Sequence, residues 1–176
     1  MEMIRLDTSR VMGPMVNQSD APFRALALKY GATCVYSQML FADQIVEQEG
    51  YLEAVLPEAD FSSFPAQLSR PLCIQIAGND PTLLASACQV ILEKYGGCID
   101  AIDFNLGCPQ DRAKEGMYGA FLLDKHLWPC VFECVSRMKN GLSKITGPHI
   151  SIQLPILTYY SCLLQLFEEE YLYIAK

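Results

Sequence analysis

The sequence predicts an α/β fold in which parallel strands alternate with helices. Short apolar runs of strand-like composition recur four times, and a stretch of helical composition follows each of them. Strands that are joined through helices pair in parallel with right-handed crossovers. A doubly wound sheet and a (β/α)8 barrel both begin in this way. No GxGxxG motif follows the first strand, which argues against a dinucleotide-binding Rossmann domain.

The first strand and helix are short and clearly delimited. The run RVMGPMV, residues 10–16, predicts a buried strand that ends in a loop. The apolar residues of APFRALALKYG, residues 21–31, have helical spacing. Asp20 is placed to cap this helix, with Pro22 in its first turn and Gly31 as its stop.

The second unit begins with ATCVYSQM, residues 32–39, whose β-rich composition predicts a second strand. Residues 40–56 are helical in composition, with an interruption at Gly50. A connection rich in proline and serine follows at residues 57–71.

The third unit contains the clearest helix. PLCIQIAGND, residues 71–80, predicts a strand that closes in a turn. The helix that follows has Asp80 as its cap, Pro81 in its first position and Gly96 after its end.

The fourth unit predicts a strand at CIDAIDFN, residues 98–105, and a helix at residues 127–142. The segment between them, DRAKEGMYGAFLL, is interpreted as a loop that Gly116 and Gly119 make mobile or tightly turned. Residues 150–157 could pair as a fifth strand.

Composition limits the classes of function. With 176 residues, 51% hydrophobic and 19% charged, the chain is long and apolar enough for one globular domain. The net charge of -7 argues against a nucleic-acid-binding surface spread over the chain, although a local basic patch is compatible with it.

The amino terminus has no apolar h-region typical of a signal peptide. Residues 150–167 carry no charge, but a proline and five polar residues among them argue against a membrane span.

The cysteines indicate a reducing environment. There are eight, without a signal peptide, and we therefore expect reduced thiols in a cytoplasmic or nuclear protein. None forms a CxxC pair and the chain has only two histidines, so no metal site is expected.

Cys108 follows the fourth strand in the stretch DFNLGCPQD. It could be a turn cysteine packed against the next helix, since free cysteine is commonly buried. Alternatively, a thiol at the carboxyl end of a barrel strand reaches the mouth where chemistry is done, as a nucleophile or a proton donor. No histidine lies near it in sequence, which favours a proton donor.

Four further features lie after or within the predicted strands. Gln75 is an amide inside an apolar strand, where it either bonds neighbouring backbone or faces a planar heterocycle. Asn105 allows the same interpretation, or simply shapes the turn. The apolar stretch Pro14 to Val16 could lie against a flat ring, and Lys114 could meet a phosphate or be solvated.

Three stretches together resemble the flavin-dependent tRNA-dihydrouridine synthases, most closely the eukaryotic branch that modifies the D-loop. They are GPMVNQSDAPFRALALKYGATCVYSQM, PLCIQIAGNDP and IDFNLGCPQDRAKEGMYGAFLL, and the resemblance covers about Val11 to Leu142. It implies a TIM barrel that holds FMN, takes electrons from NADPH or NADH, and reduces uridine in tRNA to 5,6-dihydrouridine.

The resemblance also implies roles for single residues. Cys108 matches the proton donor, and Asn105 matches an Asn that meets the substrate uracil or the flavin edge. Lys114 is assigned with Asn105 to substrate binding. The residues expected to contact FMN are Pro14, Met15, Val16 and Gln75.

The chain departs from the family's pattern after SKITGPH, residues 143–149. The family continues with a flavin-binding lysine, a later histidine and glycine-rich loops for the FMN phosphate. We therefore predict that residues 1–149 form an FMN-binding catalytic domain, a partial TIM barrel of about four to five parallel strands. Residues 150–176 are interpreted as an atypical tail that alternative splicing or a gene-model error could produce.

Three functions follow from these observations. The first is the tRNA-dihydrouridine synthase reaction with Cys108 as proton donor, and tRNA binding is expected to be weak if the chain is truncated. The second is a catalytically inactive half-barrel, which would expose an open sheet edge. The third is a barrel enzyme without flavin that uses a cysteine nucleophile. No membrane or metal partner is expected, and the oligomeric state does not follow from the sequence.

Overall fold

The computed structural model describes residues 6–56, 70–143 and 151–153 of the chain. Within these ranges, no helix is long and apolar enough to cross a membrane. The uncharged segment at residues 150–167 lies almost entirely outside the described residues.

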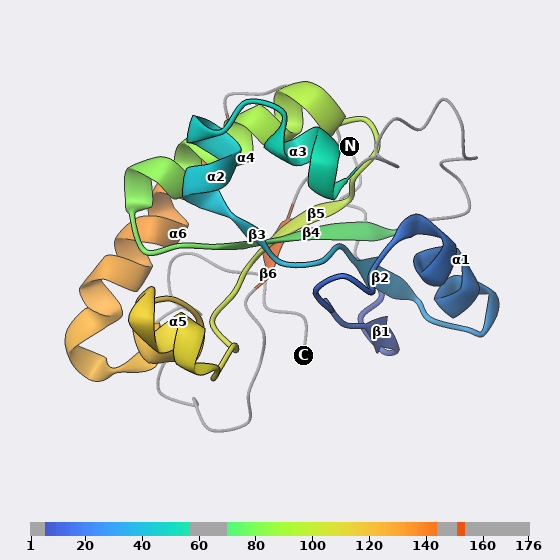
Figure 1. The fold of residues 1–176 in the computed structure, drawn as a ribbon, viewed down its shortest axis with the longest axis horizontal. Helices are drawn as coiled ribbons and strands as arrows, with labels where there is room; N and C mark the ends of the chain where they lie inside the picture. Colours follow the sequence, from blue (N-terminus) through green and yellow to red (C-terminus); the bar gives the residue numbers. More distant parts are fainter. Residues whose placement is uncertain (1–5, 57–69, 144–150, 154–176) are drawn as a thin grey trace.

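A parallel sheet forms the centre of the fold (Figure 1). Its strands follow the order β1-β2-β4-β5-β6, and β3 pairs with β4 beside this path. All pairings among the described strands are parallel, which confirms the predicted fold class. The strands span Val11–Met12 (β1), Cys34–Tyr36 (β2), Leu40–Phe41 (β3), Leu72–Ala77 (β4), Ala101–Phe104 (β5) and Ser151–Gln153 (β6).

Helices connect and cover the strands. Figure 1 shows α2, α3 and α4 together on one side of the sheet, while α1 lies beside β1 and β2. The long helices α4 and α6 pack against each other. The helices span Ala21–Lys29 (α1), Ala42–Glu47 (α2), Tyr51–Val55 (α3), Pro81–Tyr95 (α4), Asp111–Glu115 (α5) and Trp128–Ser143 (α6), with 3₁₀ turns at Gly119–Leu123 (η3) and Lys125–Leu127 (η4).

Two helices begin with the capping chemistry that the sequence predicts. The Asp20 carboxylate accepts a hydrogen bond from the Phe23 N–H at 2.9 Å. The Asp80 carboxylate accepts from the N–H groups of Thr82 and Leu83 at 2.7 and 2.9 Å. Proline stands in the first turn of both helices, where its missing N–H costs nothing. The predicted starts of α1 and α4 are therefore confirmed.

The predicted helix over residues 40–56 is wrong at its beginning. Leu40–Phe41 forms strand β3, which pairs with the end of β4, and the helix begins only at Ala42. Leu40 is fully buried, so burial and strand pairing outweigh the helical composition of the segment. Gly50 has φ +79° and separates α2 from α3, which confirms the predicted interruption.

The segment interpreted as a loop between β5 and α6 contains short helices instead. Residues 111–115 form α5, and η3 and η4 follow before α6 begins. Ala113 is fully buried and anchors α5, although its neighbours are exposed. A single buried position in a polar segment gives no helical period, so the sequence pattern does not reveal this helix.

The two faces of the sheet differ in chemistry. One face packs on the helices through large apolar side chains, among them Val35, Ile74 and Phe104. Because side chains alternate along a strand, the residues between them point to the opposite face. That second face carries Cys34, Tyr36, Cys73, Gln75, Ala101 and Asp103. We refer to these six residues as the inner face.

Candidate active site

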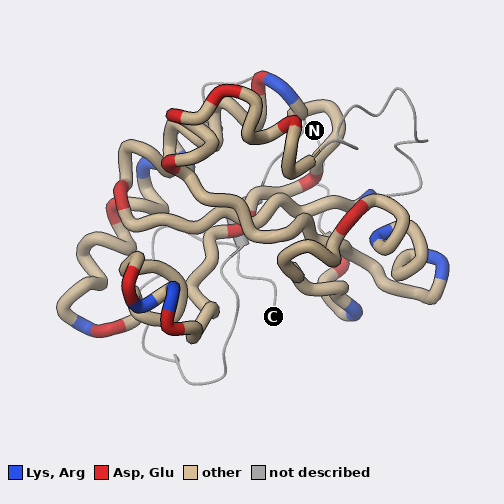
Figure 2. Tube along the Cα trace, viewed as in Figure 1, with Lys and Arg blue, Asp and Glu red and all other residues tan. Residues whose placement is uncertain are grey.

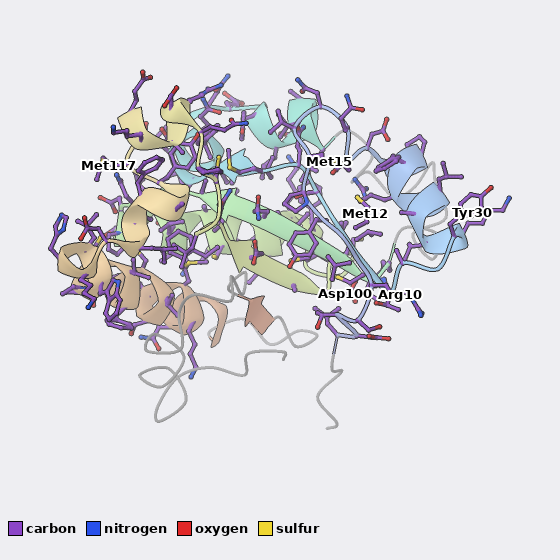
Figure 3. The ribbon with its side chains drawn as sticks, turned by 90° about the horizontal axis from the view of Figure 1, so that it is seen from below. Arg10, Met12, Met15, Tyr30, Asp100 and Met117 are labelled. Carbon is purple, nitrogen blue, oxygen red and sulfur yellow. The ribbon has the colours of Figure 1, made fainter. Side chains whose placement is uncertain are left out.

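The residues predicted for the site belong mainly to the carboxyl ends of the strands. Figure 3 shows Met15 well away from Arg10 and Asp100, which mark the amino ends of β1 and β5. In a barrel, the carboxyl ends of the strands form the face where chemistry is done. The predicted site residues are Pro14, Met15, Val16, Gln75, Asn105, Cys108 and Lys114.

Gln75 joins three neighbouring strands through hydrogen bonds. Its side chain is 6% exposed, and its Nε2 donates to Asp103 Oδ2 at 2.7 Å. Its Oε1 accepts from Asn105 Nδ2 at 3.2 Å. The backbone N–H of Gln75 donates to Ser37 Oγ, just after β2, at 3.1 Å. The amide that the sequence singled out is therefore satisfied by side chains rather than by neighbouring carbonyl groups.

Asn105 connects this group to the loop that carries Cys108. Its Oδ1 accepts hydrogen bonds from the backbone N–H groups of Gly107 and Cys108, at 2.9 and 3.0 Å. Its Nδ2 donates to Met39 Sδ as well as to Gln75. An Asn side chain has two donor hydrogens and two acceptor positions, and all four are used here. Asn105 thus shapes the turn, and its contact with a substrate stays a prediction.

Cys108 lies in a loop that is held in place by contacts with the 3₁₀ turn η3. Its carbonyl oxygen accepts from the Ala120 N–H at 3.0 Å. Gly119 has φ +66°, and a Cβ atom there would lie 2.6 Å from the same oxygen. The Cys108 side chain is partly exposed and packs on a small cluster that includes Tyr118. Only glycine permits this close approach of η3 to the loop.

No histidine in the described part of the chain is placed to act on this thiol. His126 is exposed, and its Nδ1 lies 2.9 Å from Asp124 Oδ1. His149 lies outside the described residues. A cysteine–histidine pair, which a nucleophilic mechanism would favour, therefore has no support in the described ranges.

Asp103 is the only charged residue in the described strands, and it lies on the inner face. The residue is 1% exposed, and its Oδ1 has no hydrogen-bond partner among the described residues. Burial raises the pKa of Asp103 to about 7, and the hydrogen bond from Gln75 acts in the opposite direction. Burial also raises the pKa of the Cys34 thiol to about 12 and that of the Cys73 thiol well above its usual value.

The predicted flavin contacts Met15 and Val16, in the loop after β1, are more exposed than Gln75. Met15 and Val16 are 39% and 58% exposed, so apolar surface is available there. The Met15 N–H, however, already donates to Ser19 Oγ at 2.9 Å. The loop is tied to the rest of the fold by Gln38, whose Oε1 accepts from the Asn17 N–H and whose Nε2 donates to the Val55 carbonyl.

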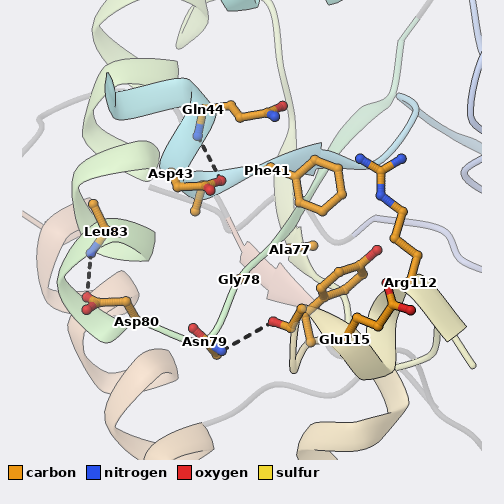
Figure 4. A pocket seen from close by; sticks show the side chains of 13 residues that line it. Phe41, Asp43, Gln44, Ala77, Gly78, Asn79, Asp80, Leu83, Arg112 and Glu115 are labelled. Atoms are coloured by element: carbon orange, nitrogen blue, oxygen red, sulfur yellow. Dashed lines mark hydrogen bonds between the residues drawn. The ribbon is translucent and has the colours of Figure 1, made fainter. Parts of the chain in front are cut away.

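A cavity of about 500 Å³ lies near this region but shares no residue with the predicted site. It opens between the starts of α2 and α4 and the helix α5 (Figure 4). Arg112 lies over the Phe41 ring with its Cζ atom 5.3 Å from the ring centre, and Tyr118 meets the same ring edge-on. Lys114 is exposed on α5 and does not line the cavity.

Charged residues lie mostly on the helices and loops, with both signs interspersed (Figure 2). The described ranges contain no group of three or more histidine, cysteine or acidic side chains arranged to hold a metal ion. The cysteines in these ranges are all free thiols.

A model of the family described as dihydrouridine synthase (Dus) matches residues 11–152. The chain belongs to the dihydrouridine synthase family. The match covers the four predicted units, including the turn with Cys108 and the first two residues of β6.

Named relatives agree with this assignment. The chain is 37% identical over 134 residues to the tRNA-dihydrouridine(16/17) synthase [NAD(P)(+)] of Saccharomyces cerevisiae, which is 76% of this chain and 29% of that protein. It is equally similar to the protein of the same name from Schizosaccharomyces pombe, over 31% of that protein. The human tRNA-dihydrouridine(20a/20b) synthase [NAD(P)+]-like protein is 31% identical over 84% of this chain and 41% of its own length. The chain thus spans less than half the length of these relatives.

Dihydrouridine synthases have a TIM-barrel fold, and the described strands and helices form part of such a barrel. Within the described residues, the sheet is open rather than closed into a ring. The structure brings three of the predicted residues into one hydrogen-bonded group, namely Gln75, Asn105 and Cys108.

Sequence reasoning missed Asp103 in this member of the dihydrouridine synthase family. A signal was present, because Asp103 is an acid within an apolar strand and stands two residues before Asn105. Residues two apart on a strand share a face, so Asp103 had to lie on the same side as Asn105. Its pairing with Gln75 depends on the register between β4 and β5, which the sequence pattern does not specify.

Proposed function

We propose that this protein reduces uridine in tRNA to 5,6-dihydrouridine, with FMN as cofactor, NADPH or NADH as reductant and Cys108 as proton donor. The observation that carries the proposal is the direct hydrogen-bonded connection from buried Gln75 through Asn105 to the Cys108 loop, in a member of the dihydrouridine synthase family. It joins a candidate cofactor contact to a candidate proton donor at one end of the sheet.

The part of the site formed by Gln75, Met15 and Val16 fits a planar heterocycle. Among the described residues, Gln75 uses one of its two Nε2 hydrogens and one of its two Oε1 acceptor positions. One donor and one acceptor therefore remain for a ring edge. Met15 and Val16 offer exposed apolar surface, on which the flat face of a ring could lie. Lys114 is the one cationic side chain among the predicted site residues, and we assign it to the phosphate groups of the substrate.

Gln75, Met15 and Val16 would hold FMN, which would supply hydride chemistry for C6 of the uracil ring with NADPH or NADH as the source of electrons. The Cys108 thiol then delivers its proton to C5, and the resulting thiolate recovers a proton from solvent. A thiol held at a fixed position in a loop can serve as a general acid. The hydrogen bonds from the backbone N–H groups of Gly107 and Cys108 to Asn105 hold the loop in position for the transfer.

The substrate base must leave its stack to reach the site. Enzymes that act on a base within folded nucleic acid extrude it into a pocket, and tRNA loops present bases that are easily unstacked. We propose the D-loop of tRNA as the target, and accordingly the cytoplasm or nucleus as the location. The net charge of -7 predicts weak binding of tRNA phosphates by this chain alone.

The test combines a spectrum with an assay. The 176-residue chain is mixed with FMN and desalted, and its visible spectrum is recorded; dihydrouridine in unmodified tRNA is then measured with NADPH or NADH. We expect retained flavin, and a loss of reduction of at least about 100-fold in Cys108→Ala, the usual effect of removing a general acid. Cys98→Ala, which removes another partly exposed thiol, is the matched control. Equal rates in the two variants would remove Cys108 from the mechanism.

An inactive half-barrel is the second candidate for this chain, favoured by the open sheet. Among the described strands, β1 pairs only with β2 and β6 only with β5, so each has one edge without a strand partner. Such edges recruit other strands. A folded chain that retains no flavin and self-associates in sedimentation would support this candidate over the enzyme.

A further inference from the structure

The inner face contains one acidic group to which neither the proposed mechanism nor the predicted site assigns a role. Asp103 is 1% exposed, its Oδ2 is bonded to the Gln75 amide, and its Oδ1 has no hydrogen-bond partner among the described residues. Burying a carboxyl group away from water is costly, and core positions on a strand normally hold apolar residues. Its position beside Gln75 suggests a function in the site.

The orientation of an amide side chain is ambiguous unless its partners specify it. Gln and Asn each present an oxygen and an NH₂ group of nearly equal size, so a rotation of 180° exchanges a donor for an acceptor. The Gln75 amide has two side-chain partners, Asp103 on one side and Asn105 on the other. Which group it offers to a third partner depends on both.

One end of this series is fixed by the backbone. Asn105 Oδ1 accepts from the N–H groups of Gly107 and Cys108, which can only donate. The Asn105 Nδ2 group must therefore face Gln75, and the Gln75 Oε1 atom must accept the hydrogen bond from it. Rotating the Gln75 amide would bring two NH₂ groups into contact, with the loss of a buried hydrogen bond.

The other end is fixed by Asp103. Above about pH 7, where the Asp103 carboxyl group is ionised, it can only accept, so it requires the Nε2 group of Gln75 on its side. Below that pH, the protonated group still carries an acceptor oxygen for Nε2. The two constraints agree, and the hydrogen bond between Gln75 Nε2 and Asp103 Oδ2 is 2.7 Å long. Without an acceptor at this position, only the longer bond of 3.2 Å to Asn105 would hold the Gln75 amide.

We propose that Asp103 is a positioning residue that fixes the orientation of the Gln75 amide and, through Asn105, the loop that holds Cys108. The significance for catalysis rests on the proposed function, because it requires that Gln75 face the cofactor and that Cys108 face the substrate. The arrangement itself is a property of the protein without any ligand.

Two substitutions separate this role from mere filling of space. In Asp103→Asn, the side-chain oxygen still accepts from Gln75 Nε2, and the new NH₂ group occupies the place of the unpartnered Oδ1. In Asp103→Leu, a side chain of similar size fills the same apolar surroundings but offers no acceptor. Asp100→Asn is the control. Asp100 directly precedes β5, and its carboxylate accepts a hydrogen bond from Arg70 at 2.6 Å rather than from Gln75.

The first measurement is a ¹H–¹⁵N spectrum of the chain without flavin. We expect Asp103→Asn to keep the side-chain signals of Gln75 and Asn105 and the backbone signal of Cys108 near their wild-type positions. Asp103→Leu should shift or broaden all three, while Asp100→Asn leaves them in place. If Asp103→Leu left the three signals unchanged, the proposal would be overturned.

If the Asp103→Leu variant does not fold, a pH titration of the wild-type chain followed in the same spectra tests the proposal instead. Its three signals should move together with the Asp103 carboxyl carbon as pH is raised, and independent movement would refute the coupling.

The second measurement is FMN binding by the same proteins. Loss of one oriented hydrogen bond predicts about a tenfold higher Kd for Asp103→Leu, and a wild-type Kd for Asp103→Asn and Asp100→Asn. Equal Kd values and flavin spectra in wild type and Asp103→Leu would overturn the role of Asp103 towards the cofactor while leaving the proposed function intact. If the wild-type chain binds no FMN, the proposed function fails for this chain, and the amide and backbone signals alone decide whether Asp103 positions the loop.

Discussion

Replacement of Asp103 by Asn should change the pH dependence of stability more than stability itself. Burial raises the pKa of this carboxyl from 3.8 in the unfolded chain to about 7 in the folded protein. Between these two pH values, the unfolded chain releases a proton that the folded protein retains. The free energy of unfolding therefore falls as pH rises through this window, and the contribution is lost above about pH 7.

The size of the effect follows from the shift. One pKa unit corresponds to about 1.4 kcal/mol, so a shift of roughly three units predicts a loss of up to about 4 kcal/mol between pH 4 and pH 8. The groups that face Asp103 on the inner face are Cys34, Tyr36 and Cys73, and burial raises the pKa of each. They titrate above this window and do not mask the effect. An amide at position 103 carries no charge and removes the dependence.

Urea unfolding at a series of pH values, followed by circular dichroism, measures this difference. The free energy of unfolding of Asp103→Asn relative to wild type should rise steadily from pH 4 to pH 8. Asp111→Asn removes the same formal charge from an exposed position and corrects for the change in net charge. Wild-type and Asp103→Asn curves that run parallel over this range would show that the Asp103 carboxyl does not keep its proton to near neutral pH in the folded chain, and the reasoning from burial would be refuted.

Two further substitutions test how the site is built. Gly119→Ala should lower the free energy of unfolding by about 1–3 kcal/mol, because of its φ of +66°, and displace the Cys108 loop, which thiol alkylation kinetics would report. Gly97→Ala, with no atom within 4 Å of the added methyl group, is its control and should leave the alkylation rate unchanged. Asp80→Ala should destabilise the protein by about 1 kcal/mol in urea unfolding through loss of the α4 cap, while Asp80→Asn retains most of it.

The fold could be predicted largely because its signals are local. Caps such as Asp80, stops such as Gly31 and the apolar strands depend on neighbours in sequence, and the structure confirms the parallel pairing that they imply. Strand β3 escaped prediction because two residues are too few to give a period. Its extended form depends on pairing with β4, which is distant in sequence. The helix α5 escaped because one buried alanine gives no pattern.

The candidate site was only partly predictable for the same reason. Polar residues within a predicted strand or directly after one can be located from the sequence, and this identified Gln75, Asn105 and Cys108. The partner of a buried amide depends on strand register, which the sequence does not reveal, and so Asp103 was overlooked. The cavity beside Arg112 needs the packing of three helices and a strand end, and no local pattern predicts it.

The energetic cost of Asp103 supports a functional interpretation of the inner face. Near pH 8, its burial opposes folding by up to about 4 kcal/mol, whereas an Asn or Leu would relieve that cost. A residue that only filled space would have no reason to be charged. A Leu offers no acceptor to Gln75 Nε2, whereas a carboxylate offers one in either orientation of its side chain. The cost is therefore best explained by what the acceptor specifies, namely the direction in which the Gln75 amide and the Cys108 loop face.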